Sequence, residues 1–169
     1  MADSAENLKQ IACDRIEAQT PQLKALSQDI WNHPELCFQE TYAHQTITDF
    51  LEQRGFNVER SYKIPTAFKA VPKNIDNNKG TNIAVLCEYD ALPEIGHACG
   101  HNLIAIIGVA TSLGIQAALN ANPKMRENGR VRVKTIFFYK YQMIIPKILI
   151  VLKYCTFVQC LDEGGTFGV

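Results

Sequence analysis

The sequence of 169 residues lacks any excess of charge, because seventeen Lys and Arg residues balance seventeen Asp and Glu residues. Without net charge or a basic block, nothing in it favours nucleic acid or an anionic membrane surface as a partner. Its first residues, MADSAE, are acidic and lack the basic and then apolar pattern of a secretory signal. These absences predict a cytoplasmic protein with no nucleic acid or membrane partner.

Paired cysteine spacing is absent as well. The six cysteines, at positions 13, 37, 87, 99, 155 and 160, do not have the spacing of a secreted disulfide framework, so we expect free thiols. Cys13, Cys37 and Cys87 are expected to be small buried residues. The length suits one domain, and 47% apolar residues are enough to build a core.

The most informative stretch runs from residue 81 to residue 102, TNIAVLCEYDALPEIGHACGHN. The apolar run from Ile83 to Cys87 predicts a buried strand, which ends at the charged residues Glu88 and Asp90. Ligands bind at strand ends in open α/β sheets, because the loops there carry polar groups that a packed sheet cannot accommodate. We therefore expect the chemistry of this protein at the end of this strand.

Two histidines and a cysteine follow within five residues, as His97, Cys99 and His101. In an extended backbone, side chains two residues apart share a face, so these three can point the same way. Thiolate and imidazole are donors that zinc prefers. From the residues alone, two interpretations stay open, a divalent metal site or a core cysteine with histidines nearby.

The segments EYDALP, at 88–93, and GHACGHN, at 96–102, resemble the metal-binding segment of a known family. This is the aminoacylase and carboxypeptidase family of di-zinc metallopeptidases (peptidase family M20), in particular its amidohydrolase branch with a Cys-Gly-His signature. The resemblance implies Cys99 and His101 as metal ligands and Asp90 as the catalytic-site carboxylate that orients a ligand or the bridging water. It places His97 beside the metals without making it a ligand.

The same resemblance implies the fold and the substrate. The expected fold class is α/β, here a partial three-layer α/β/α domain of the zinc-peptidase type, without the lid or dimerisation domain. Two zinc ions would occupy a complete site of the family. The implied substrate is a dipeptide, with a basic C-terminal residue as the branch suggests, or an N-acyl amino acid.

Helices are predicted before this stretch. Apolar residues at helical spacing favour one helix over residues 5–19, and Thr20 as N-cap with Pro21 at the first helical position favours a second. The second helix is expected to end before Pro34, because the residue preceding a proline avoids helical conformation. Four of its residues are expected to face inward: Leu23, Leu26, Ile30 and Trp31.

Further elements follow from the same patterns. A third amphipathic helix is expected from Glu40 to Arg54, with Gly55 as its left-handed stop and His44 on its polar surface. Residues 56–62 and 66–71 predict two strands, residues 73–80 a loop, and residues 129–133 the start of another strand. Residues 103–120 carry apolar side chains on nearly every face, which favours a helix buried against the sheet.

The composition changes after Lys134. Residues 136–160 contain no Gly, Ala, Asp or Glu but hold six of the fifteen aromatic residues. A membrane span and a basic interfacial helix are alternatives, although Lys140, Lys147 and Lys153 interrupt the apolar run. We expect two parts, with residues 1–134 as the N-terminal part of a metallopeptidase catalytic domain and residues 135–169 as a divergent or aberrant tail.

Members of the family continue from the strand near residue 133 into a turn with a Glu-Glu pair, which supplies the general base and a ligand. This sequence has no Glu-Glu pair. Asp162 and Glu163 resemble that turn only as acidic residues next to glycine, and they come much later in the chain. We therefore expect a metal-dependent hydrolase of the dipeptidase or amidohydrolase type that is inactive in this truncated form. The alternative is a non-catalytic isoform that binds or regulates a full-length subunit.

Overall fold

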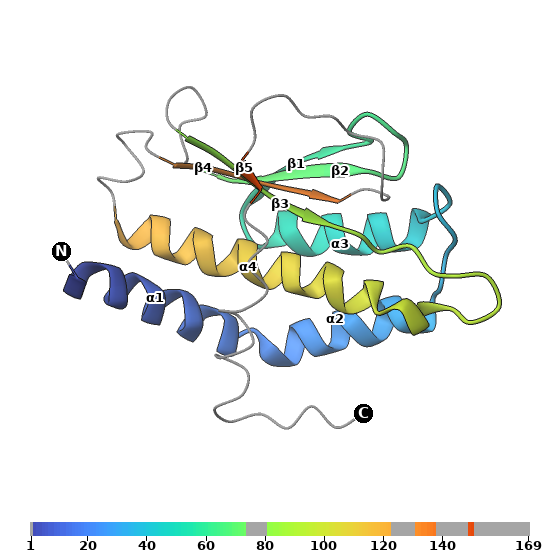
Figure 1. Cartoon of the computed structure of the whole chain (residues 1–169), viewed down its shortest axis with the longest axis horizontal. Helices are drawn as coiled ribbons and strands as arrows, with labels where there is room; N and C mark the ends of the chain where they lie inside the picture. The colour runs from blue at the N-terminus through green and yellow to red at the C-terminus, as the bar shows by residue number, and fades with distance from the viewer. Residues whose placement is uncertain (1, 74–80, 123–130, 138–148, 151–169) are drawn as a thin grey trace.

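The structure is a computed structural model that describes residues 2–73, 81–122, 131–137 and 149–150 (Figure 1). Its elements follow in chain order: α1 (Ala2–Glu17), α2 (Thr20–Asn32), α3 (Thr41–Gln53), β1 (Phe56–Arg60), β2 (Phe68–Pro72), β3 (Thr81–Cys87), the 3-10 turn η1 (His97–Cys99), α4 (His101–Ala121), β4 (Val131–Phe137) and β5 (Leu149–Ile150). Each helix and strand that the sequence predicts within these residues is present, with ends shifted by a few positions.

The five strands form one sheet in the order β1-β2-β4-β3-β5. β1 and β2 form an antiparallel pair, and β2 also pairs antiparallel with β4. β3 lies parallel to β4 over its whole length, from Thr81 opposite Val131 to Cys87 opposite Phe137, and α4 connects the two strands. Because parallel strands need such a crossover, α4 must begin at the carboxyl end of β3, where the predicted ligands lie.

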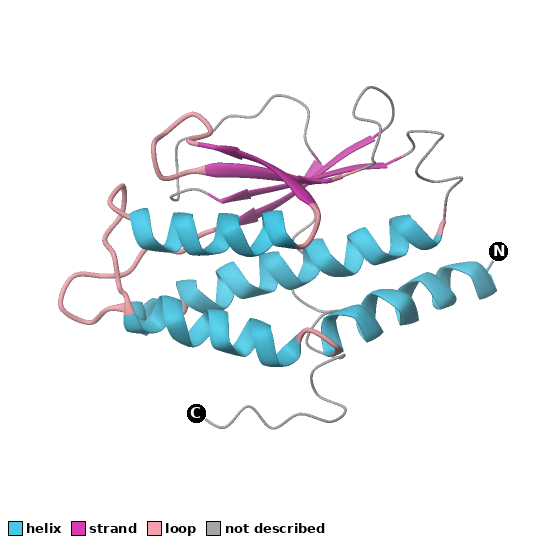
Figure 2. Cartoon of the chain, turned by 180° about the vertical axis from the view of Figure 1, so that it is seen from behind, coloured by secondary structure: helices cyan, strands magenta, loops and turns pink. Residues whose placement is uncertain are grey.

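The described helices lie on one face of the sheet (Figures 1 and 2). α3 and α4 contact the strands, whereas α1 and α2 pack on α4 from the other side. The α/β fold class is confirmed as a partial domain. Of the expected α/β/α arrangement, the described residues show the sheet and helices on one of its faces, in two successive layers.

The core lies between the sheet and the helices. Its largest fully buried side chains are Phe56 and Phe68 from the strands, Ile30 from α2, Ile47 and Leu51 from α3, and Leu113 and Val109 from α4. Burying such side chains stabilises the fold by roughly 2 kcal/mol each. This core anchors the start of α4 relative to the end of β3.

Two details of α2 differ from the sequence prediction. Gln19 is the N-cap, and Thr20 lies inside the first turn, where its hydroxyl donates to the carbonyl of Ile16 at 3.4 Å. This bond to the preceding helix competes with a capping role. Leu23, Leu26 and Ile30 are buried as predicted, but Trp31 is 49% exposed, because it lies one position beyond the buried stripe.

Two predictions of exposure and burial were also wrong. His44 is half-buried rather than on the surface, and its ring packs edge-on against Phe68 at a centroid distance of 5.8 Å. Cys87 is buried as expected, whereas Cys13 and Cys37 are half-buried. The predicted stop at Gly55 is confirmed, with a φ of 84°.

α4 is long and apolar enough to cross a membrane by length and composition, but 56% of its most apolar window is buried inside the fold. One face of α4 packs closely on α1 at Gly114. A Cβ added at this glycine would lie only 2.9 Å from Cδ1 of Ile16 and 3.4 Å from Cβ of Ala12. Leu103 and Ile107 are 57% and 45% exposed, so the prediction of a helix buried on nearly every face was too broad.

β4 continues to Phe137, so the boundary expected after Lys134 falls within a strand of the sheet. β5 pairs parallel with β3, with Leu149 opposite Ile83. The loop predicted at 73–80 lies outside the described residues except for Lys73, as does the tail from 151 to 169, including Asp162 and Glu163. The division of the chain at 134 therefore stays a prediction.

Candidate metal centre

The segment between β3 and α4 is held by backbone hydrogen bonds on both sides. The amide of Ala91 donates to the carbonyl of Glu35 at 2.7 Å, and Leu36 forms an isolated parallel bridge with Ala91. Leu92 and Gly96 close the next turn through two hydrogen bonds of 2.9 and 3.0 Å. The segment is thereby fixed to the loop that joins α2 to α3.

Gly100 sets the direction in which α4 leaves this segment. Its φ of 80° lies in the left-handed region, and apart from its chain neighbours no atom lies within 4 Å of the position that a Cβ would occupy. Conformation rather than space therefore requires glycine here, because a side chain would cost roughly 1 kcal/mol in that region. The turn places His101 at the first position of α4, next to Cys99 at the end of η1.

His101 is bound to Asp90 through one ring nitrogen. Its Nδ1 lies 2.8 Å from Oδ1 of Asp90 and 3.0 Å from the carbonyl oxygen of the same residue. A carboxylate and a carbonyl only accept hydrogen bonds, so Nδ1 carries the proton and donates it. The Asp90 side chain is 5% exposed, which makes this bond a firm constraint on the imidazole.

The other ring nitrogen of His101 faces a second carboxylate. Its Nε2 lies 3.2 Å from Oε2 of Glu88, whose side chain is 22% exposed. Glu88, Asp90 and His101 each offer one donor atom, and these three atoms all lie within 4.8 Å of one another. The donor set of one imidazole and two carboxylates therefore fits a divalent cation such as zinc.

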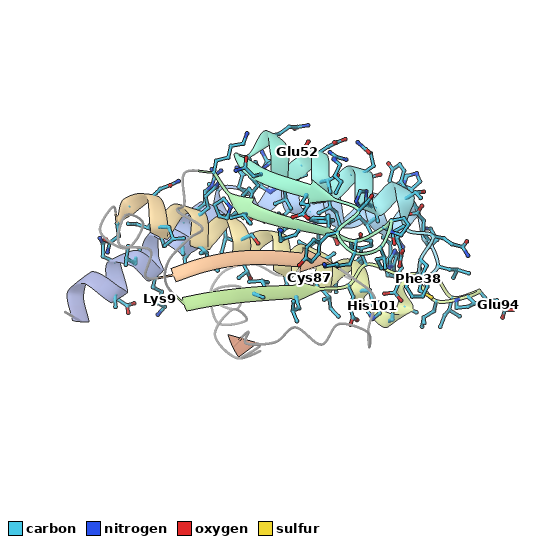
Figure 3. The ribbon with its side chains drawn as sticks, turned by 90° about the horizontal axis from the view of Figure 1, so that it is seen from above. Lys9, Phe38, Glu52, Cys87, Glu94 and His101 are labelled. Carbon is cyan, nitrogen blue, oxygen red and sulfur yellow. The ribbon has the colours of Figure 1, made fainter. Side chains whose placement is uncertain are left out.

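Cys99 lies beside this group. Its thiol Sγ is 3.8 Å from the carbonyl oxygen of Asp90, the same oxygen that Nδ1 of His101 contacts. The thiol is half-buried and is not one of the three grouped donors. The structure thus brings Asp90, Cys99 and His101 together, with Glu88 rather than Cys99 facing the free nitrogen of His101. Figure 3 shows His101 toward the end of the molecule opposite Lys9.

His97 is the most deeply buried imidazole near the site. It is 2% exposed, and neither ring nitrogen has a hydrogen-bond partner among the described residues. Burial, and then the neighbouring His101, lower the pKa of His97, so the ring is neutral at pH 7. Its ring lies 6.5 Å from that of Trp31, which places it between α2 and the candidate site.

Two further ionisable groups at the end of β3 are held neutral. Burial, and then Glu88, raise the pKa of the Cys87 thiol, and burial followed by Glu40 and Glu35 raises the pKa of Tyr89. The Tyr89 hydroxyl donates to the carbonyl of Thr66. Neither group competes as an anionic ligand, which leaves the donors at 88, 90, 99 and 101.

Sequence reasoning missed the parts played by Glu88 and Glu35. Glu88 was interpreted only as a charged strand end, yet its position two residues before Asp90 places both carboxylates on one face of extended backbone. Glu35 caps α3, because its carboxylate accepts hydrogen bonds from the Thr41 hydroxyl at 3.0 Å and from the amides of Tyr42 and Ala43 at 2.9 Å. Five residues separate Glu35 from the start of α3, so the sequence gave no capping signal at this distance.

Comparison with known proteins finds similar sequences among hydrolases. The chain is 44% identical over 127 residues to the Xaa-Arg dipeptidase of Mus musculus, a match that covers 71% of this chain and 30% of the relative. It is 33% identical over 121 residues to one subunit of the p-aminobenzoyl-glutamate hydrolase of Escherichia coli, a match that covers 61% of this chain and 24% of the relative. No family model matches the chain.

The fold has a solved counterpart. A dinuclear metal-binding peptidase of the M20 family from Bacillus subtilis superposes with a TM-score of 0.54 and 28% identity, over 72% of this chain and 35% of that one. The fold is thus that of a partial α/β domain of the M20 peptidase type. The chain is similar in sequence to Xaa-Arg dipeptidases and in fold to a solved M20 peptidase, and it spans about a third or less of the length of the proteins it matches.

Proposed function

We propose that this chain binds a divalent metal ion, zinc by the chemistry of its donors, as part of a hydrolase site for amide bonds. The observation that carries the proposal is the contact of His101 with Asp90 at 2.8 Å, at the carboxyl end of a parallel strand. A ligating histidine commonly donates its second ring N–H to a carboxylate, which fixes the tautomer and strengthens the ligand.

The residues have distinct parts in this proposal. Cys99 and His101 hold the metal, and Asp90 orients His101 through Nδ1, so that Nε2 presents its lone pair. The positive end of the α4 dipole lies at the same place and favours negative charge there. When bound, the metal supplies a water of lowered pKa and polarises the carbonyl that the water attacks.

We further propose that the chain alone does not turn over substrate. Amide hydrolysis needs a group that takes the proton of the attacking water and passes it to the leaving amine. The family resemblance assigns that part to a Glu-Glu pair, and the sequence has none. Dipeptides with a C-terminal arginine, and N-acyl amino acids, are the proposed substrate class, because the relatives are named for such compounds.

The test is metal content together with turnover. The chain is purified, dialysed against zinc and analysed for bound metal, and it is then incubated with an arginine-terminated dipeptide and with p-aminobenzoyl-glutamate. We expect stoichiometric zinc and no hydrolysis above buffer. Absence of bound metal would overturn the metal site. Turnover that is lost on Cys99→Ala would overturn the proposed inactivity.

A second candidate function is association with a full-length, relative-like subunit. The exposed large apolar side chains of the described residues come from segments that meet at the carboxyl end of β3 (Figure 1), and we name this set the apolar rim: Trp31, Leu36, Phe38, Tyr42, Leu92, Ile95, Leu103 and Ile107. Exposed apolar surface of this kind marks interaction sites. The partner would supply the part of the catalytic domain that this chain does not match.

Size-exclusion chromatography with light scattering tests the association. The chain is mixed with a full-length Xaa-Arg dipeptidase, and we expect a complex that the double variant Leu103→Ser with Ile107→Ser weakens. The control is Glu59→Gln, at an exposed position on β1 that is not part of the apolar rim. Two separate species in the wild-type mixture would exclude this function without affecting the metal site.

A further inference from the structure

The contact between Nε2 of His101 and Oε2 of Glu88 is the unusual feature of the site. Nδ1 of His101 already donates to Asp90, so in a neutral imidazole Nε2 carries a lone pair. That lone pair faces a carboxylate oxygen at 3.2 Å. Two acceptors at this distance repel each other unless a positive charge lies between them, and that charge is either a proton or a metal ion.

The spacing is that of two ligands of one ion. Metal bonds from zinc to imidazole nitrogen and carboxylate oxygen are about 2.0–2.2 Å long, and two such bonds at a near-tetrahedral angle separate their donor atoms by roughly 3.3 Å. The observed 3.2 Å agrees with this value. The carboxylate of Asp90, in contrast, accepts the hydrogen bond from the protonated Nδ1 of the same ring and does not face Nε2.

We propose that Glu88 is a direct metal ligand that shares an ion with Nε2 of His101. The inference rests on the proposed metal-binding function and adds a ligand that the family resemblance does not assign. The assignment gives the two carboxylates of the Glu-Tyr-Asp segment different roles. Glu88, 22% exposed, reaches the ion from the solvent side, whereas Asp90, 5% exposed, orients the imidazole from the core.

Calorimetric titration of the purified chain with Zn²⁺ at pH 7.5 tests the proposal. Glu88→Gln keeps the shape of the side chain but removes its charge, and we expect at least a tenfold weaker dissociation constant. The matched control is Glu94→Gln, an exposed carboxylate in the same loop, which we expect to leave the constant within twofold of the wild type. Circular dichroism and urea unfolding in EDTA show whether each variant folds.

Glu88→Asp serves as a second variant that keeps the carboxylate on a shorter arm, and we expect its affinity to fall between those of wild type and Glu88→Gln. Equal zinc affinity of wild type and Glu88→Gln, with the control unchanged, would show that the charge between Glu88 and His101 is a proton and would overturn this assignment alone. A wild-type chain that binds no zinc would instead overturn the metal-binding function itself.

Discussion

Nδ1 of His101 and Oδ1 of Asp90 lie 2.8 Å apart although the two residues are eleven positions apart in the chain. The intervening segment folds back through η1 and the left-handed Gly100. This turn brings the imidazole of His101, at the start of α4, against Asp90, which follows the end of β3. This hydrogen bond determines which nitrogen of His101 is available to a ligand.

Asp90→Asn should therefore weaken metal binding without abolishing it. The amide can still accept from Nδ1 but no longer provides the negative charge that makes the imidazole a stronger donor. We expect a 10- to 100-fold loss of zinc affinity with unchanged stoichiometry, measured by calorimetry. A constant equal to that of the wild type would show that Asp90 does not act through His101.

Cys99 should add a sulfur ligand that cobalt makes visible. When Co²⁺ replaces zinc, we expect the near-ultraviolet charge-transfer absorption of a metal-bound thiolate in the wild type and its loss in Cys99→Ser. Cys37→Ser is the control, since Cys37 is a half-buried thiol outside the site. Retention of the absorption in Cys99→Ser would assign the sulfur to another residue.

Glu35 should contribute to stability through the first turn of α3. Glu35→Ala removes the acceptor of three hydrogen bonds, from the Thr41 hydroxyl and the amides of Tyr42 and Ala43. Loss of such a cap lowers the free energy of unfolding by about 1–2 kcal/mol. Urea unfolding compared with Glu94→Ala measures the loss, and equal midpoints for the two variants would contradict the capping role.

Close packing of α1 on α4 at Gly114 predicts a graded effect of side-chain size. A Cβ here would lie 2.9 Å from Cδ1 of Ile16 and 3.4 Å from Cβ of Ala12. In Gly114→Ala, Ile16 can shift and the gain in helix propensity offsets the strain, so we expect little change. Gly114→Leu should lower stability by about 1–3 kcal/mol through overpacking, as thermal unfolding would show. Equal melting temperatures for both variants would refute the packing.

His44 should make the protein less stable as the pH falls. Burial, and then Arg60, lower the pKa of His44 in the folded protein, and its Nε2 has no hydrogen-bond partner among the described residues. The unfolded chain therefore takes up this proton first, at a pKa of about 6.5, so stability is full above that pH and is lost as the pH falls toward the folded pKa. His44→Gln should flatten the pH dependence of the unfolding free energy between pH 7.5 and 5.5, as urea unfolding would show, and an unchanged pH dependence would contradict the role of His44.

The sequence predicted the helices and strands well, because the signals for these elements come from residues close together in the chain. The apolar run that forms β3 and the stop at Gly55 depend on neighbours a few residues away, and both are present. The errors arose from contacts between distant segments. His44 is covered by Phe68 of the second strand, and Trp31 extends toward His97 rather than into the core.

The site was predictable in part for the same reason. The spacing of Cys99 and His101 and the resemblance around them identified the loop, but the orientation of the His101 ring depends on how η1 and Gly100 turn the chain. The facing of Glu88 and Nε2 is a property of that turn. In the sequence, Glu88 does not differ from any charged residue at the end of a strand. Only the fold shows that the carboxylates of Glu88 and Asp90 have different positions around His101.

Glu35 joins two parts of the molecule with two different groups, since its side chain caps α3 while its carbonyl receives the amide of Ala91. The order of the first turn of α3 is therefore coupled energetically to the order of the segment between β3 and α4, before any ion binds. Slow hydrogen exchange at the Ala91 amide would follow the integrity of α3, and loosening the start of that helix would raise the entropic cost of assembling the donors around zinc.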